Sequence, residues 1–272
     1  MKPSGIITLT TDFGLQDEYV GVMKGVILSR FPQATIVDLT HNIQPHDIQD
    51  ASIIIESAYR YFPPGTVHLV VVDPGVGSGR NILAVESDEH YFIAPDNGTL
   101  STILRSDSES QVYQVANLDL FTDRVSSTFH GRDIMTPIAA ALADGMDISF
   151  VGPAISVEDS VKMTQPSVET SPDGDQLIGE VIHVDHFGNI RTSISRKALV
   201  SHLQSREPSI KIGDYTIYEI SNSYSEKDQG QAVALFDSRD YLEIAVNRGN
   251  AAKLLACRVG DRVTVQPRRI SL

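Results

Sequence analysis

The spacing of apolar residues divides the 272-residue chain into two parts with different rhythms. In the first part, short runs of branched apolar residues alternate with stretches in which apolar residues recur every three or four positions. The runs predict strands, and the longer stretches predict amphipathic helices. We expect strands at 6–10, 35–39, 67–72, 82–85, 91–93 and 111–115, and helices at 17–31, 48–62, 99–104 and 134–143. This alternation predicts an α/β domain with a mainly parallel sheet flanked by helices.

The rhythm changes after Val151, where prolines and polar residues interrupt the chain without helical spacing. We place a linker at 156–175, between an N-terminal domain at 1–155 and a C-terminal domain at 176–272. Short strands dominate the C-terminal part, at 178–184, 210–212, 232–236, 242–246 and 262–265. This pattern predicts a small antiparallel β domain.

The amino-acid composition and the charge indicate the compartment and the kinds of partner to expect. The single cysteine, Cys257, excludes an internal disulfide and a cysteine-rich zinc site, which is typical of a reducing compartment. Neither a signal peptide nor a membrane-length apolar run is present in the sequence, so we expect a cytoplasmic protein with no membrane partner. The net charge of -13, from 22 basic and 35 acidic residues, repels phosphate backbones, and we expect no nucleic-acid partner.

The strand expected at 67–72 runs directly into Asp73, which is followed by three glycines within five residues and then Arg80. Open α/β sheets bind ligands where their strands end, so Asp73 occupies a position typical of chemistry. The glycines allow a tight turn that brings Arg80 back toward Asp73. The alternative is a solvated turn closed by a surface ion pair.

Three other strand ends in the first part carry polar residues. Asp12 suits the hydroxyls of a ribose, because two acceptor oxygens match a vicinal diol; it is equally suited to cap the following helix. The Asp96-Asn97-Gly98 segment is a common turn. His130 precedes a helix and is followed by Gly131, so it is a candidate for catalysis or for a structural role.

Two segments of the C-terminal part suit the two ends of an amino acid. Asp185 would bind an ammonium while Phe187 packs against a flat group, although the segment also fits a hairpin turn. Arg239 would bind a carboxylate with both of its guanidinium branches, unless it is simply exposed.

Taken together, these segments resemble the S-adenosyl-L-methionine (SAM) hydrolases, also called SAM hydroxide adenosyltransferases, which are related to fluorinase and chlorinase. The resemblance covers essentially the whole chain and rests on 11–14, 72–80, 94–98, 129–133, 185–189 and 238–239 in that order. It implies an N-terminal α/β domain, a C-terminal β-barrel and a homotrimer with sites between subunits. The implied reaction is attack of water or hydroxide at C5′ of SAM, which gives adenosine and L-methionine.

The resemblance also implies a role for each matching residue. Asp73, Arg80 and His130 match the family's catalytic triad. Asp12 matches the carboxylate that holds the ribose hydroxyls, and Phe129 matches a ring beside the ribose.

In the C-terminal domain the implied roles concern the two ends of the substrate. Asp185 and Asn189 match residues around the methionine amino end and the adenine, and Phe187 matches an aromatic residue of the adenosyl pocket. Ser238 and Arg239 match the pair that holds the methionine carboxylate. The implied reaction requires no metal and no cofactor, because the sulfonium already makes methionine a good leaving group.

Three alternative functions have features that distinguish them. A halide-using relative carries a long insertion where this chain has only 86–90, a tyrosine in place of Asp73, and a Tyr-Ser pair in place of His130-Gly131; a carboxylate would also repel the halide. A sensor that only binds SAM or a nucleoside would not need the triad. A metal-dependent phosphohydrolase would use Asp12, Asp17, Asp73, His130 and Asp133, but its usual paired-ligand motifs are absent from the sequence.

Overall fold

The computed structural model describes residues 1–164 and 166–268. It separates into two compact units, residues 1–163 and 164–272, and the division falls inside the segment 156–175 that we expect to be a linker. Residue 165 of that segment and residues 269–272 of the expected C-terminal domain lie outside the described ranges. The domain boundaries themselves stay a prediction.

The first unit is built on a mixed sheet in the strand order β2-β1-β3-β5-β4-β6-β7. The strands are β1 (Ile6–Thr11), β2 (Thr35–Thr40), β3 (Val67–Val71), β4 (Ile82–Ser87), β5 (His90–Pro95), β6 (Gln111–Gln114) and β7 (Ala154–Ile155). The pairs along β2-β1-β3-β5 are parallel, and those along β5-β4-β6-β7 are antiparallel. The α/β class is confirmed, but the parallel arrangement holds for four strands only. The reason is the two-residue turn at Asp88-Glu89, whose positive φ angles reverse the chain between β4 and β5.

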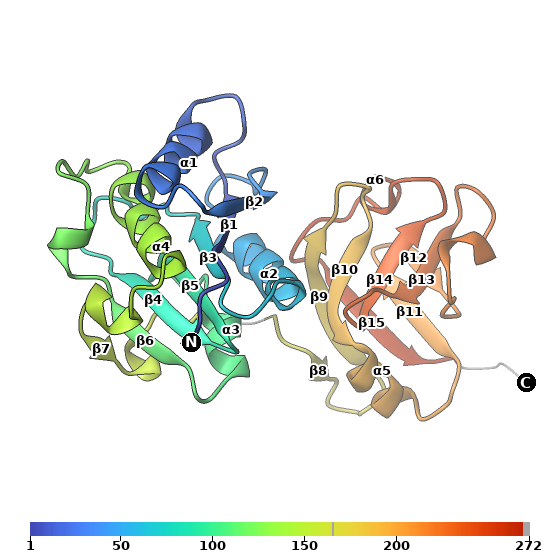
Figure 1. Ribbon diagram of the computed structural model, residues 1–272. Helices are drawn as coiled ribbons and strands as arrows, with labels where there is room; N and C mark the ends of the chain where they lie inside the picture. The colour runs from blue at the N-terminus through green and yellow to red at the C-terminus, as the bar shows by residue number, and fades with distance from the viewer. Residues whose placement is uncertain (165, 269–272) are drawn as a thin grey trace, which may run out of the picture. The chain divides into compact units, whose positions relative to one another are not determined.

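Helices cover both faces of this sheet (Figure 1). On one face, α1 (Tyr19–Arg30) packs beside α4 (Thr136–Ala143), which continues a π-helical turn at Gly131–Met135. On the other face lie α2 (Ile48–Ala58) and α3 (Ser101–Ser106). Two apolar clusters fill the two interfaces, so all five residues of β3 are buried. This continuous apolar run is what made β3 recognisable in the sequence.

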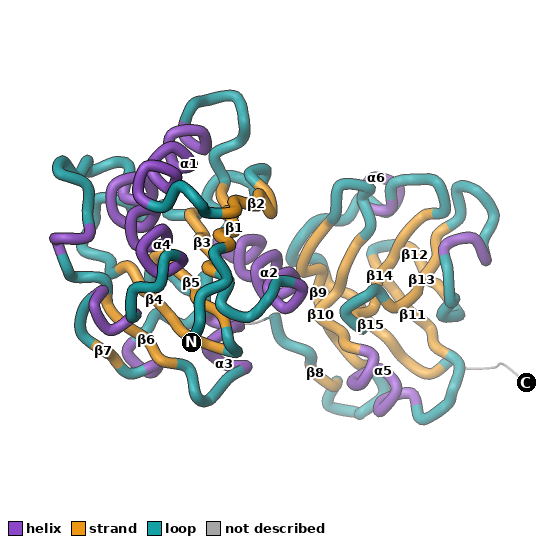
Figure 2. The backbone as a smooth tube through the Cα atoms, viewed as in Figure 1, coloured by secondary structure: helices purple, strands orange, loops and turns teal. Residues whose placement is uncertain are grey.

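The second unit is an antiparallel sheet in the order β12-β11-β15-β9-β10-β14-β13, with β8 paired to β9. Its elements are β8 (Glu169–Thr170), β9 (Leu177–Val184), β10 (Ile190–Ser195), α5 (Arg196–Leu203), β11 (Pro208–Ile212), β12 (Tyr215–Ile217), β13 (Ala232–Phe236), β14 (Tyr241–Val246), α6 (Ala251–Leu254) and β15 (Arg262–Pro267). The strands curve around one apolar core, and the end strands β12 and β13 approach each other (Figure 2). The predicted barrel-like β domain is confirmed.

The sequence pattern missed β10 because the polar Thr192 and Ser193 occupy two of its four buried positions. Thr192 is fully buried, and its hydroxyl donates to the carbonyl of Leu242 on β14 at 2.9 Å. A buried hydroxyl with a partner is tolerated in a core, so the strand does not need an apolar residue there. The helix expected to reach residue 62 ends at Ala58 and is followed by a 3₁₀ turn at Tyr59–Tyr61.

No helix in the described ranges is long and apolar enough to span a membrane.

Two histidines are buried within the first sheet and face each other. His68 Nδ1 lies 2.8 Å from Thr8 Oγ1, and His68 Nε2 lies 3.2 Å from His90 Nδ1. Burial lowers the pKa of His68 to about 3, and burial also lowers the pKa of His90. Both rings are therefore neutral in the folded protein at neutral pH and gain protons when the chain unfolds.

We predict that these histidines make the first unit sensitive to acid. Because the folded pKa of His68 lies below the unfolded value of 6.5, its contribution to stability is complete above pH 6.5 and is lost as the pH falls toward 3. The free energy of unfolding, measured with urea at pH 7 and at pH 5, should change less between these pH values for His68→Asn than for the wild type. The difference should correspond to at most about one fewer proton taken up on unfolding. The exposed His186→Gln is the control, and an equal pH dependence in His68→Asn and the wild type would contradict the prediction.

Candidate active site

The turn that follows β3 is held by hydrogen bonds within the turn and by a close backbone contact with another segment. Ser78 Oγ donates to the carbonyl of Gly75 at 2.7 Å and accepts the backbone N–H of Arg80 at 3.3 Å. Gly77 has a φ of +78°, and a Cβ there would lie 2.3 Å from the carbonyl oxygen of Ser127. Only glycine permits this backbone contact, which packs the turn against the segment leading to His130.

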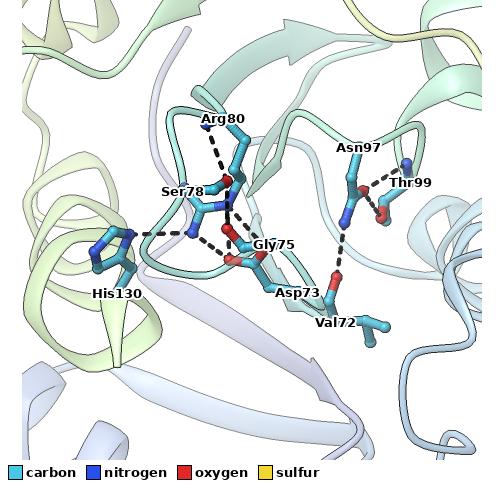
Figure 3. A network of polar contacts seen from close by, with 8 residues as sticks. All are labelled: Val72, Asp73, Gly75, Ser78, Arg80, Asn97, Thr99 and His130. Carbon is cyan, nitrogen blue, oxygen red and sulfur yellow. Dashed lines mark hydrogen bonds and ion pairs between the residues drawn. The ribbon is translucent and has the colours of Figure 1, made fainter. Parts of the chain in front are cut away.

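This turn places Arg80 between Asp73 and His130 (Figure 3). Arg80 Nε donates to both oxygens of Asp73, at 2.8 and 2.9 Å, and Nη2 contacts Oδ2 as well. The same Nη2 lies 3.1 Å from His130 Nδ1. The Asp73 and Arg80 side chains are only 6% and 11% exposed, so the pair is not the surface ion pair of the alternative interpretation.

The contact with Arg80 determines the protonation of His130. A guanidinium can only donate, so Nδ1 must accept and the proton of the neutral ring lies on Nε2. Burial, with a further contribution from the positive charge of Arg80, lowers the pKa of His130 below its ordinary value of 6.5. The ring is therefore neutral at pH 7, and its Nε2–H is a donor.

Gly131 explains how His130 comes close to the end of β3. A Cβ at Gly131 would lie 2.9 Å from Val71 Cγ1, so a side chain there would push the helix away from the strand. The π-helical turn begins at this glycine, and such turns often occur at functional sites.

A cavity of ≈ 330 Å³ lies beside the triad, and residues of the first unit line it. Asp73 and His130 line one part, and Asp12 and His46 line another. One wall is aromatic: Phe13, Tyr19 and Phe129 contact one another edge to face, with ring centroids 5.4 to 5.7 Å apart. The cavity therefore combines an apolar wall with two carboxylates, which suits a ligand with a flat or apolar part and hydroxyl groups.

Asp12 does not cap the helix that follows it. The N-cap of α1 is Glu18, and no side chain caps this helix. Instead, Asp12 Oδ2 accepts the backbone N–H of His46 at 2.9 Å, which ties the end of β1 to the loop after β2. The ribose-binding role stays a prediction, because the second carboxylate oxygen and the remaining lone pair of the first suit a diol.

The Asp96-Asn97-Gly98 segment is a turn, as its composition predicts, but it also supports the site. Asn97 Nδ2 donates to the carbonyl of Val72 at 2.9 Å, and its Oδ1 accepts from the backbone and hydroxyl of Thr99 (Figure 3). The bond to Val72 holds the residue that immediately precedes Asp73.

Two of the four carboxylates that a metal-dependent phosphohydrolase would need are already paired with arginines. Asp73 is bound by Arg80, and Asp133 is bound by Arg132 and by the backbone of Ser126. Within the described ranges, no three His, Cys, Asp or Glu side chains form a group that could hold a metal ion.

In the second unit, the 185–189 segment is the turn of the β9–β10 hairpin. Asp185 Oδ1 accepts the backbone N–H groups of Phe187 and Asn189 at 2.9 and 2.8 Å, and Oδ2 accepts the Asn189 side chain at 2.9 Å. The hairpin interpretation is confirmed, and Phe187 is 71% exposed at its tip. The binding roles of these residues stay predictions.

Ser238 and Arg239 are exposed in the turn between β13 and β14. On β14, the buried Glu243 accepts a hydrogen bond of 2.7 Å from the hydroxyl of the more exposed Tyr224. Burial raises the pKa of the Glu243 carboxyl, and the charges of Asp237 and Asp185 raise it further. The binding roles of Ser238 and Arg239 stay predictions.

Sequence reasoning missed several residues of the cavity wall and its supports. Tyr19 lies within the helix expected at 17–31, yet its ring forms part of the wall and the residue is 42% exposed. Its place in the first turn after β1 is the signal that could have identified it, because ligands bind at such strand ends.

Family models match both units of the chain. Residues 7–152 match the N-terminal domain of the SAM hydroxide adenosyltransferases, and residues 179–264 match their C-terminal domain. The chain belongs to the SAM hydroxide adenosyltransferase family. A family member from Salinispora tropica named (R)-S-adenosyl-L-methionine hydrolase is 34% identical over 97% of this chain and 99% of its own length. A crystal structure of an uncharacterized conserved protein from Thermotoga maritima has a TM-score of 0.87 at 35% identity, over 96% of this chain and 99% of that one.

The family's halide-using relatives are also similar to this chain. A fluorinase from Actinopolyspora mzabensis is 30% identical over 96% of both chains. This identity is lower than that of the hydrolase from Salinispora tropica, and the triad residues bear on the choice between water and halide as well.

We predict that Arg80 sets the protonation of His130. Replacing Arg80 with methionine removes a positive charge that lowers the pKa of His130, so the pKa should rise toward 6.5, whereas Arg80→Lys should change it less. An NMR titration of the His130 ring measures the shift without any substrate. An unchanged or lower pKa in Arg80→Met would show that the two side chains do not interact as described.

Proposed function

We propose that this protein hydrolyses S-adenosyl-L-methionine to adenosine and L-methionine. The observation that carries the proposal is the placement of Arg80 against both Asp73 and His130 beside a cavity with an aromatic wall. The hydrolase names of close relatives support the same reaction.

The reaction is an in-line displacement at C5′ of the substrate. A water oxygen forms a bond to C5′ while the C5′–S bond breaks, and the bonding electron pair stays on sulfur to give neutral methionine. The water also loses a proton. Arg80 keeps its positive charge and favours hydroxide beside it, and Asp73 accepts the proton, because the neutral His130 ring carries a proton on Nε2 and its Nδ1 is already bound by Arg80. Asp12 and Phe129 hold the ribose, which fixes C5′ in line with the nucleophile.

The second unit holds the ends of the substrate in this proposal. Ser238 and Arg239 bind the methionine carboxylate, and Asp185 and Asn189 bind the amino end and the adenine, with Phe187 packed against the adenosyl group. We further propose that the protein acts in the cytoplasm as a homotrimer in which neighbouring chains supply the two sets of residues. Light scattering of the purified protein measures the number of chains directly.

Water rather than halide is the proposed nucleophile for an electrostatic reason. Asp73 places a carboxylate at the triad, which can accept a proton from a neutral water molecule but repels an anion such as fluoride or chloride, which has no proton to give. The chain also lacks the long insertion of the halide-using relatives, because only a two-residue turn joins β4 to β5.

The product identifies the reaction. We expect the protein, incubated with SAM in ¹⁸O-labelled water and excess chloride or fluoride, to form adenosine with one ¹⁸O at the 5′ position and unlabelled methionine. Chromatography with mass spectrometry measures both products, and Asp73→Asn is the control, with a much lower rate. A 5′-halogenated nucleoside as the main product would overturn the proposal, and binding without any product would favour a sensor.

A further inference from the structure

The turn at 237–240, which carries Ser238 and Arg239, is built around the side chain of Asp237. Asp237 Oδ1 accepts the backbone N–H of Arg239 at 2.9 Å and that of Tyr241 at 3.0 Å. The backbone closes the turn from the other side, where the N–H of Asp240 donates to the carbonyl of Asp237 at 3.0 Å. One carboxylate oxygen thus fixes the main chain of Arg239.

The second oxygen of Asp237 is held from the neighbouring strand. Arg191 on β10 donates its Nε–H to Asp237 Oδ2, and the two side chains are only 13% and 5% exposed. A pair with so little solvent contact is screened far less than a surface pair. Arg191 therefore connects Asp237, around which the turn is built, to strand β10 of the sheet.

The surroundings of Arg191 explain why it turns to Asp237. Arg191 lies opposite Glu243 in the β10–β14 register. Glu243, however, accepts a hydrogen bond from the Tyr224 hydroxyl, and burial raises the pKa of its carboxyl. Asp237 is then the carboxylate that pairs with the guanidinium.

We propose that Asp237 and Arg191 are positioning residues that hold the 237–240 turn in the shape with which Arg239 receives the carboxylate of the ligand. The inference rests on the proposed function, in which Arg239 binds the methionine carboxylate. A turn that is already ordered loses less conformational freedom when the ligand binds, so the pair strengthens binding without touching the ligand.

The same turn contains a matched control. Asp240 pairs with Arg196 at 2.7 Å, but these two side chains are 69% and 50% exposed. Exposed ion pairs contribute little to stability. Asp240→Asn therefore removes an equivalent charge from the same turn without affecting its buried support.

The first experiment needs no substrate. Hydrogen exchange of the Arg239 and Tyr241 amides should be much faster in Asp237→Ala than in the wild type, closer to the wild type in Asp237→Asn, which keeps one acceptor oxygen, and unchanged in Asp240→Asn. Asp237→Ala with Arg191→Met removes the uncompensated charge if Asp237→Ala alone does not fold. Wild-type exchange rates at both amides in these variants would overturn the proposal.

The second experiment tests whether the support acts through the carboxylate. For SAM, Asp237→Ala should raise KM about tenfold with little change in kcat, because only binding is affected, and Asp237→Asn, which keeps one acceptor oxygen, should raise KM less. For decarboxylated SAM, an analogue that lacks the methionine carboxylate, Asp237→Ala should leave KM unchanged, and adding Asp237→Ala to Arg239→Ala should have no further effect on SAM.

Calorimetric Kd values replace KM if the wild type does not turn over, so failure of the proposed reaction leaves this comparison intact. An equal loss of affinity for both compounds, or no loss for either, would overturn the proposal.

Discussion

The site depends on one guanidinium that is shared between a carboxylate and an imidazole. Arg80 has only donors, and it uses them on Asp73 and on His130 Nδ1 in a place with little solvent. This arrangement gives Asp73 a cationic partner, keeps His130 neutral, and leaves a permanent positive charge beside the cavity. A charge that is already in place when the reaction begins needs no reorganisation, and this is the main way in which enzymes stabilise a developing anion.

The fold provides this arrangement by bringing strand ends together through close backbone contacts. Asp73 follows β3, and His130 reaches β3 because Gly131 has no side chain to contact Val71. Asn97, after β5, holds the carbonyl of Val72. In both units, carboxylates near the candidate sites also hold the backbone of the loops that carry them, as Asp12 does for the loop at His46 and Asp237 does for Arg239. Carboxylates that the sequence marks as candidate ligand-binding residues therefore also stabilise the loops around them.

The sequence predicted what depends on local pattern and missed what depends on contacts between distant segments. The buried run of β3 and the glycine turn after it predicted the Asp73–Arg80 pair, because seven residues of chain can close such a turn. The contact of Arg80 with His130 spans 50 residues, so no local pattern encodes it, and only the family resemblance grouped these residues. Tyr19 fits the spacing of the helix expected at 17–31, so that pattern gave no sign of its place in the cavity wall. Arg191 and Asp237 lie 46 residues apart and meet only because β10 pairs with β14.

In the proposed mechanism, Arg80 acts on the reaction and not on the affinity for the substrate. Calorimetric binding of SAM together with single-turnover rates, in Arg80→Met and in Arg239→Met, separates these two effects. Arg80→Met should lower the rate by about two orders of magnitude or more and leave Kd nearly unchanged, whereas Arg239→Met should weaken binding with a smaller effect on the rate at saturation. Loss of binding in Arg80→Met, with a rate at saturation close to that of the wild type, would show that Arg80 binds the substrate and does not drive the reaction.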